Sequence, residues 1–236
     1  MINEIDNINE GFKMQSLNEV AYESILSDIL KLKFLPGERI QDKQLIERLK
    51  ISRTPVREAI LRLKNDGLMT TVPQSGTYVT RISLRSALNA RFVRQSVERS
   101  VVTEAAQQMN KLNILDSRNM IEKQKLASEE HNAVDFFYLD NEFHQTFYTA
   151  TKRDEVWNWL ANLSLQLDRY RFLRIKQTDM PLDKLIDQHA KILDAVEAGN
   201  EELAGQRAFD HLNLMLAEKD ELLQQFPDYF SDEGRK

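Results

Sequence analysis

The chain has 236 residues, of which 42% are hydrophobic and 29% charged, and it contains no cysteine. These values are typical of a soluble globular protein with one large or two modest domains, and the lack of cysteine excludes disulfides and thiolate metal sites. The formal net charge is −5, yet the stretch from Lys31 to Lys64 holds ten basic and four acidic residues. Such a local basic patch attracts phosphate, so the acidic total does not exclude nucleic-acid binding.

The beginning of the sequence carries no recognisable targeting signal. No apolar run reaches the roughly 20 residues that a membrane span needs, and the first residues lack the basic-then-apolar order of a secretion signal. We therefore expect a cytoplasmic protein. Residues 1–14 are polar and are predicted to form a flexible arm.

The first predicted helix runs from Leu17 to about Lys33, because its apolar residues recur near the helical period. Ser16 is expected to cap its start, and Pro36-Gly37 to end it. A second, short helix is predicted from Lys43 to Lys50, with Asp42 as its cap.

A third helix is predicted to begin near Thr54-Pro55, where proline is tolerated, and to end at Gly67. Its apolar residues follow the i, i+3, i+4, i+7 spacing of one buried face: Val56, Ala59, Ile60 and Leu63. Two β-prone runs, 68–72 and 77–80, flank a turn that contains Gly76, which predicts a hairpin. Three helices and a hairpin within residues 15–82 predict a winged helix-turn-helix domain.

After Arg81 the sequence becomes almost entirely helical in pattern, because glycine and proline nearly disappear. About six helices are predicted, near 84–108, 113–130, 133–151, 154–178, 182–198 and 201–225. They favour an antiparallel bundle over residues 83–228, followed by a tail at 229–236. The chain is expected to fray from Pro227 onward. The predicted fold class is therefore mostly α: a winged helix-turn-helix with a β-hairpin wing, then an all-α bundle.

The N-terminal half carries a dense set of turn and helix residues over about 50 positions. They are Leu35-Pro36-Gly37-Glu38-Arg39-Ile40, Leu45, Leu49, Ser52-Arg53-Thr54-Pro55-Val56-Arg57-Glu58-Ala59-Ile60, Leu63, Asp66-Gly67-Leu68 and Gly76. This pattern resembles the GntR family of bacterial regulators. The resemblance implies DNA contacts by Lys43, Arg53, Thr54, Arg57 and the wing glycine Gly76.

The physical chemistry of the third helix agrees with that implication. In a helix-turn-helix, the N-terminal end of the second helix of the motif reaches base edges in the major groove. Arg53 and Arg57 can grip guanine bidentately. The hydroxyls of Ser52 and Thr54 suit phosphate oxygens. A two-fold operator needs two such helices, so we expect a homodimer on palindromic DNA. The alternative for these charges is that they merely solvate the outer face of a helix.

The C-terminal half contains a candidate metal site. Asp140 and His144 are four residues apart and so share one helical face. His189 and His211 lie on later predicted helices, whereas His131 beside Glu129 and Glu130 is interpreted as a surface residue. Three imidazoles and one carboxylate suit Zn²⁺ or Ni²⁺. Taken alone, the Asp140–His144 pair is more typical of a surface ion pair.

A second resemblance strengthens the metal interpretation. Leu139-Asp140, Phe143-His144, Gln188-His189, Ile192, Ala195, Gly199-Asn200, Ala208 and His211-Leu212 are similar to the FCD domain of the FadR branch of GntR regulators. The resemblance implies a metal held by Asp140, His144, His189 and His211. Val93-Arg94 and Glu98 resemble the first helix of that domain, where the arginine faces the ligand cavity. The alternative, which has equal weight, is that Arg94 only forms a structural ion pair with Glu98.

The sequence thus predicts a ligand-responsive DNA-binding regulator, with repression as its expected mode and no enzymatic activity. A small carboxylate effector would bind the metal and Arg94, and thereby change the affinity for operator DNA. Three alternatives stay open: a metal-dependent enzyme, a metal-free domain that binds an acyl-CoA-like ligand, and a regulator whose signal is the metal itself. The sequence contains no nucleophile elbow, phosphate loop or HExxH motif, which disfavours the enzyme.

Overall fold

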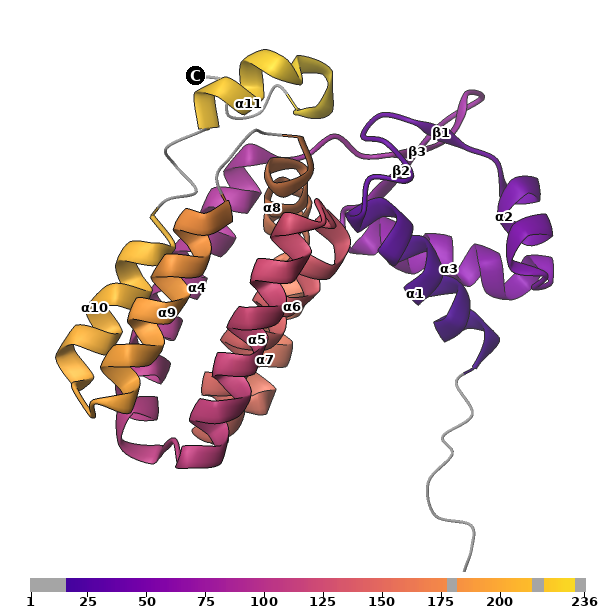
Figure 1. Ribbon diagram of the computed structural model, residues 1–236. Coiled ribbons are helices and arrows are strands. Elements are labelled where there is room, and N and C mark those ends of the chain that lie inside the picture. The colour runs from indigo at the N-terminus through magenta and orange to yellow at the C-terminus, as the bar shows by residue number, and fades with distance from the viewer. Residues whose placement is uncertain (1–15, 178–181, 214–218, 232–236) are drawn as a thin grey trace, which may run out of the picture.

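The computed structural model describes residues 16–177, 182–213 and 219–231. They form a small part with three helices and a sheet, beside a long helical bundle (Figure 1). Within these described residues, no helix is both long and apolar enough to pass through a membrane. The mostly helical fold predicted from the sequence is confirmed.

The small part contains three helices, α1 (Leu17–Leu30), α2 (Asp42–Leu49) and α3 (Arg53–Asn65). Ser16 caps α1 as predicted, since its side chain accepts a hydrogen bond from the Glu19 backbone at 3.4 Å. The predicted cap of α2 is wrong by one position: Gln41 is the N-cap and Asp42 is the first helical residue. An acidic residue in the first turn still favours the helix start through the helix dipole.

The inward faces of these helices build one apolar core. It comprises Ala21, Tyr22, Ile25, Ile29, Leu45, Val56, Ala59, Ile60, Leu63, Leu68, Met69 and Val79, among others. The four residues that the helical spacing assigned to the buried face of α3 are all part of it. Gly67 follows α3 with a φ of +72°, a left-handed conformation that glycine adopts without a Cβ penalty.

A three-stranded antiparallel sheet completes this part, formed by β1 (Arg39–Ile40), β2 (Met69–Val72) and β3 (Gly76–Val79) in the order β1-β3-β2. The predicted hairpin is confirmed as β2 and β3, with Val72 opposite Gly76 nearest the turn. The strand β1 was not predicted, because two residues are too few to show an alternating pattern.

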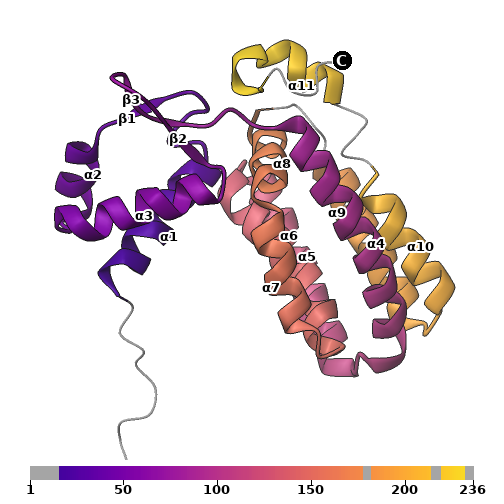
Figure 2. The ribbon, with the colours of Figure 1, turned by 180° about the vertical axis from the view of Figure 1, so that it is seen from behind.

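The bundle follows as seven helices: α4 (Leu84–Gln108), α5 (Lys111–Glu129), α6 (Ala133–Ala150), α7 (Asp154–Leu163), α8 (Leu165–Gln177), α9 (Leu182–Glu197) and α10 (Glu201–His211). α4 is the longest, and it contacts α6, α8, α9 and α10 (Figure 2). The core of the bundle is rich in aromatic residues from α6, which are Phe136, Phe143, Phe147 and Tyr148.

Two predicted helices are each divided. The prediction of one helix over 154–178 is wrong, because α7 ends at Leu163 and α8 begins at Leu165. The Ser164 backbone N–H bonds to Ala161 O at 3.2 Å, which closes α7 with a tight turn. The prediction of one helix over 201–225 is also wrong: α10 ends at His211, and α11 (Lys219–Gln225) is separate.

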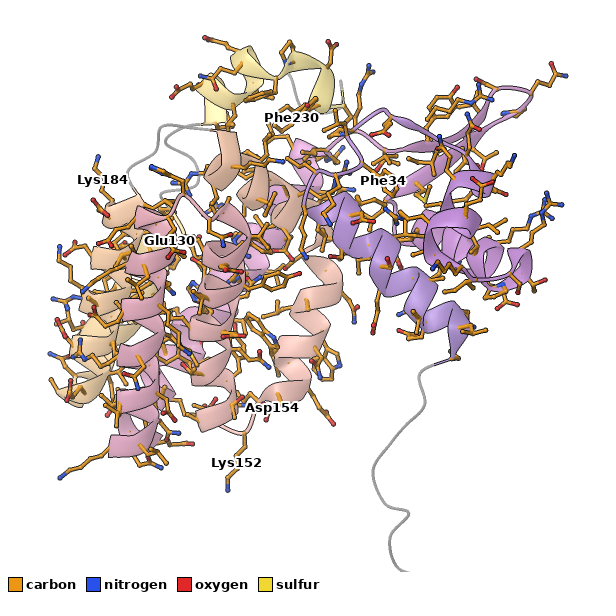
Figure 3. The ribbon with its side chains drawn as sticks, turned by 45° about the vertical axis from the view of Figure 1, so that its right-hand side comes forward. Phe34, Glu130, Lys152, Asp154, Lys184 and Phe230 are labelled. Atoms are coloured by element: carbon orange, nitrogen blue, oxygen red, sulfur yellow. The ribbon has the colours of Figure 1, made fainter. Side chains whose placement is uncertain are left out.

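The C-terminal segment packs against the linker between the two parts. After α11, a 3₁₀ turn spans Pro227–Tyr229, and Phe230 is only 1% exposed. Phe230 forms a parallel β-bridge with Ile82, flanked by backbone hydrogen bonds Ile82 N–H to Tyr229 O and Ser231 N–H to Ile82 O. Figure 3 labels Phe230 below α11. The expectation that the chain frays from Pro227 is therefore wrong for residues 227–231.

The linker is held from a second side by the start of α8. The guanidinium of Arg169, which is fully buried, donates to Thr80 O and to Thr80 Oγ1 at 3.2 Å. The Gln166 side chain accepts from Ser83 N at 3.2 Å and donates to Gly67 O at 3.1 Å. The break at Ser164 thus gives α8 its own start, where its side chains meet the linker.

Candidate metal centre and candidate DNA-binding surface

Four side chains from three helices converge inside the bundle. Asp140 and His144 come from α6, His189 from α9 and His211 from the last residue of α10. Each residue offers one possible ligand atom, and these four atoms all lie within 4.8 Å of one another. All four residues are buried. The cluster is compatible with a metal site, and it contains the four residues that the sequence indicated. His131 is exposed in the turn between α5 and α6, away from them.

Close helix packing brings His211 to the other three residues. A Cβ on Gly205 of α10 would lie 2.2 Å from Thr103 Oγ1 and 3.1 Å from Arg99 O, both on α4. Glycine at this position lets α10 lie directly on α4. The Asn200 side chain caps α10 by accepting from Leu203 N at 3.1 Å, which fixes where the helix begins and hence where its last residue lies.

Each of the three imidazoles is oriented through its outer nitrogen. Nδ1 of His189 lies 2.8 Å from Gln124 Oε1, and Nδ1 of His211 lies 2.7 Å from Gln188 Oε1. Nδ1 of His144 pairs with a carboxylate oxygen of Glu98. Metal-bound histidines in proteins almost always donate their second N–H to an acceptor of this kind.

The orientation of Gln124 determines the tautomer of His189. The Gln124 amide nitrogen donates to Leu139 O at 3.1 Å, so its oxygen is the atom that faces His189. That oxygen can only accept, and Nδ1 of His189 must therefore carry the proton. The lone pair of His189 is consequently on Nε2, which lies 3.3 Å from Nε2 of His211 and 3.5 Å from Asp140 Oδ1.

The ionisation of the cluster suits a cation. Burial lowers the pKa of His189 to about 3 and the pKa of His211 well below its usual value, so both imidazoles are neutral at pH 7. Burial by itself would raise the pKa of Asp140, but the adjacent Arg171 guanidinium and the neighbouring histidines together outweigh it and hold that pKa low. Neutral imidazoles and an ionised carboxylate are the forms that bind divalent metals.

A small cavity of about 20 Å³ adjoins the cluster, large enough for one water molecule or ion. It is lined by Asp140, His144, His211, Ile175, Leu185 and Leu212, together with the arginines Arg94, Arg171 and Arg174. Of these three arginines, the sequence indicated only Arg94. Arg171 and Arg174 are spaced like ordinary basic residues of a helix, and nothing local reveals that α8 turns them inward.

Both roles considered for Arg94 have a basis in its contacts. Its Nε donates to Glu98 Oε2 at 3.1 Å, whereas its Nη2 is buried without a hydrogen-bond partner among the described residues. Glu98 therefore joins Arg94 to His144. Burial opposes ionisation of Glu98, but His144 and Arg94 prevail and lower its pKa to about 2. Arg171, in contrast, is engaged by Asp140, by Asp168 at 2.7 Å and by Asn141 at 2.9 Å.

The elements expected to contact DNA, which are α2, the N-terminal end of α3 and the tip of the hairpin, lie on the side of the small part that faces away from the bundle (Figures 1 and 2). Ser52, Arg53 and Thr54 are exposed at the N-terminal end of α3. The side chain of Arg57 is 62% exposed and lies 3.6 Å from Asp42. Lys43 is exposed on α2, and Gly76 begins β3 with a φ of +137°.

Comparisons with known proteins agree with this architecture. Residues 17–79 match the family described as bacterial regulatory proteins, gntR family, and residues 90–214 match the FCD domain. The HTH-type transcriptional repressor RspR of Escherichia coli K12 is 29% identical over 93% of this chain and 96% of its own. The solved structure of E. coli McbR/YncC covers 90% of this chain and 100% of its own, with a TM-score of 0.76 and 21% identity. A GntR-type regulator from Rhodococcus sp. RHA1 covers 89% and 99%, with a TM-score of 0.72 and 18% identity.

Proposed function

The chain belongs to the GntR family of bacterial regulatory proteins, as a DNA-binding transcriptional regulator with an FCD domain, and we propose that a divalent metal and a small carboxylate together control its affinity for DNA. The observation that carries the proposal is the convergence of the His189 and His211 Nε2 atoms on Asp140, with each outer nitrogen engaged by an acceptor. Without a cation, the two facing Nε2 lone pairs would repel each other.

Asp140, His144, His189 and His211 would hold the metal, and nitrogen and oxygen ligands of this kind suit Zn²⁺ or Ni²⁺. The metal would supply a Lewis-acidic site for a carboxylate oxygen. Four protein ligands saturate a tetrahedral ion, so an ion that accepts more ligands leaves more room for the effector. We therefore expect a stronger response to carboxylates with Ni²⁺ than with Zn²⁺.

Arg94 would provide the second contact of the effector. Its Nη2 has no hydrogen-bond partner among the described residues, and the residue lines the cavity. A guanidinium pairs well with a carboxylate. The cavity of about 20 Å³ has room for one water molecule or ion, so a small acid requires the surrounding helices to move apart, and an acyl-CoA would require a much larger opening.

A physical route leads from this cavity to the DNA-binding part. Arg171 contacts the proposed ligand Asp140, and Arg169, two residues earlier on α8, holds the linker at Thr80. Movement of α8 on effector binding would therefore move the linker. Coupling of this kind typically changes affinity by about 1–3 kcal/mol. Because the similar protein RspR is named a repressor, we propose repression as the mode, with a homodimer that binds two-fold DNA.

The proposal is tested by thermal unfolding of the full chain after chelator treatment, then with Zn²⁺ or Ni²⁺, and then with monocarboxylic, hydroxy and dicarboxylic acids. A ligand that binds only the folded state raises the melting temperature. We expect the metal to raise it in the unaltered protein and in His131→Ala, the matched control, but not in His189→Ala. One acid class should raise it further only in the metal-loaded protein.

Other outcomes would favour the alternatives. Full metal content in His189→Ala would remove that residue from the ligand set. Stabilisation by an acid or an acyl-CoA in the chelated protein would indicate a metal-free effector domain. A metal-dependent change in DNA affinity that needs no carboxylate would indicate that the metal itself is the signal.

A further inference from the structure

The wing of this protein contains no basic residue of its own. From Met69 to Val79, the sequence of the two hairpin strands and their turn has neither lysine nor arginine. DNA affinity depends strongly on contacts between basic side chains and phosphates. If the wing lies along DNA, its positive charge must come from a neighbouring element.

The neighbouring strand β1 supplies such a charge. Arg39 is opposite Tyr78 in the register of β1 and β3, and Gly76 lies two residues from Tyr78 on the same face of β3. Arg39 is therefore the one basic residue that the described sheet carries on its three strands.

Gly76 makes room for the guanidinium of Arg39. A Cβ built on Gly76 would lie 2.8 Å from Arg39 Nε and 3.4 Å from both Cζ and Nη2. The arginine thus lies directly over the glycine backbone, near the tip of the wing. A larger residue would displace it, and the φ of +137° at Gly76 disfavours any side chain there as well.

The guanidinium of Arg39 has no counter-charge among the residues that the structure describes. No described residue forms an ion pair or a side-chain hydrogen bond with it. Arg39 is exposed, so its guanidinium is accessible from solvent. The adjacent Glu38 carboxylate is turned to the Leu35 backbone N–H at 2.7 Å. Three other exposed arginines of this part are paired, Arg62 with Glu19, Arg48 with Asp28, and Arg57 with Asp42.

We propose that Arg39 is the DNA-phosphate contact of the wing and that Gly76 acts by positioning it. The tip of the wing and the N-terminal end of α3 lie on the same outer side of the molecule (Figure 1). A duplex read by α3 would therefore lie on the side of the molecule that carries the wing. A contact to phosphate adds affinity without distinguishing sequences.

The test measures binding of two duplexes of equal length by fluorescence anisotropy between 50 and 200 mM KCl. One duplex is selected from a random pool by the unaltered protein, and the other is an unselected mixed sequence. Arg39→Gln should weaken both by the same factor. The slope of log affinity against log salt should fall by about 0.9 for each protomer bound. Arg39→Lys, which keeps the charge, should retain the slope, as should Arg85→Gln, an exposed arginine on α4.

The role of Gly76 is tested by a double-mutant cycle. If Gly76→Ala acts by displacing Arg39, its effect on affinity should be much smaller in the Arg39→Gln background than in the unaltered protein. An equal effect in both backgrounds would refute the positioning role. Unchanged affinity and slope in Arg39→Gln would refute the contact, and a loss confined to the selected duplex would show that Arg39 reads bases instead.

Discussion

At the scale of single residues, the orientation of one side-chain amide determines the chemistry of the candidate metal centre. Gln124 donates to Leu139 O and accepts from His189 Nδ1, so it ties the imidazole to the backbone of α6. Gln124 itself is fully buried on α5, although it is not a ligand. Such outer contacts fix both the tautomer and the direction of the inward lone pair.

Replacing Gln124 tests this role. Gln124→Leu removes the acceptor of the His189 N–H, and we expect the affinity for Zn²⁺ or Ni²⁺ to fall by about 10- to 100-fold. Gln124→Glu keeps an acceptor and should retain more of the affinity. Metal titration against a competing chelator measures both variants, with circular dichroism to verify folding. Equal affinities in the unaltered protein and in Gln124→Leu would show that the amide is only a packing residue.

Arg57, on the exposed side of α3, is expected to recognise bases. Its guanidinium is loosely paired with Asp42 at 3.6 Å, so DNA can displace that partner at little cost. We expect Arg57→Ala to lose about 1–3 kcal/mol of binding to a selected duplex and much less to an unselected one. The ratio of the two affinities is the measurement. An equal loss of affinity for both duplexes would show instead that Arg57 contacts phosphate and does not read bases.

At the scale of elements, the contact between α4 and α10 controls where the last metal-ligand candidate lies. Gly205 faces Arg99 O and Thr103 Oγ1 so closely that a methyl group does not fit. Thr103 Oγ1 also donates to Arg99 O at 2.8 Å. A side chain at position 205 must therefore push the two helices apart or displace the threonine.

We expect Gly205→Ala to lower the free energy of unfolding by about 1–3 kcal/mol, the usual cost of overpacking, despite the better helix propensity of alanine. Thr103→Ala should relieve part of this cost, because it removes the nearest atom. Urea denaturation of the two single variants and the double variant measures the coupling. A stabilised Gly205→Ala would show that the helices adjust freely.

The elements also show what the sequence could and could not predict. The helices and hairpin of residues 16–82 follow from local signals, such as the cap at Ser16 and the glycine at 67, and so were predicted closely. The break at Ser164 was not predicted, because no glycine or proline marks it in the sequence; contacts of α8 with the linker accompany it. Asp140 and the histidines were indicated by spacing and family resemblance. The outer partners Gln124 and Arg171 were not, since only the packing of distant helices joins them to the site.

At the scale of the whole molecule, the linker between the two parts is held on two sides. α8 bonds to it through Arg169 and Gln166, and the C-terminal segment pairs with it through the bridge between Ile82 and Phe230. Arg81 adds a hydrogen bond from Nε to Asp228 O at 2.9 Å. Neither family match includes the pairing of Ile82 with Phe230, since the gntR match ends at residue 79 and the FCD match covers residues 90–214.

Removal of the Phe230 ring should loosen this connection. Phe230→Ala deletes a side chain that is 1% exposed, and we expect the C-terminal segment to detach locally before the bundle unfolds. Trypsin should then cut after Arg81 much faster than in the unaltered protein. Asp228→Ala is the matched control, because only the backbone of Asp228 bonds to Arg81. Equal cleavage rates in all three proteins would show that α8 alone holds the linker.

The bridge between Ile82 and Phe230 also has a consequence for synthesis on the ribosome. Domains fold largely as units while the chain emerges, beginning with the N-terminal one. The core of the small part is complete once Val79 has been made, long before Phe230 is translated. The nascent protein therefore holds a finished DNA-binding part on a linker that nothing yet holds. Arg169 and Gln166 of α8 hold the linker first, and residues 227–231 add the second side last, when they close the bridge.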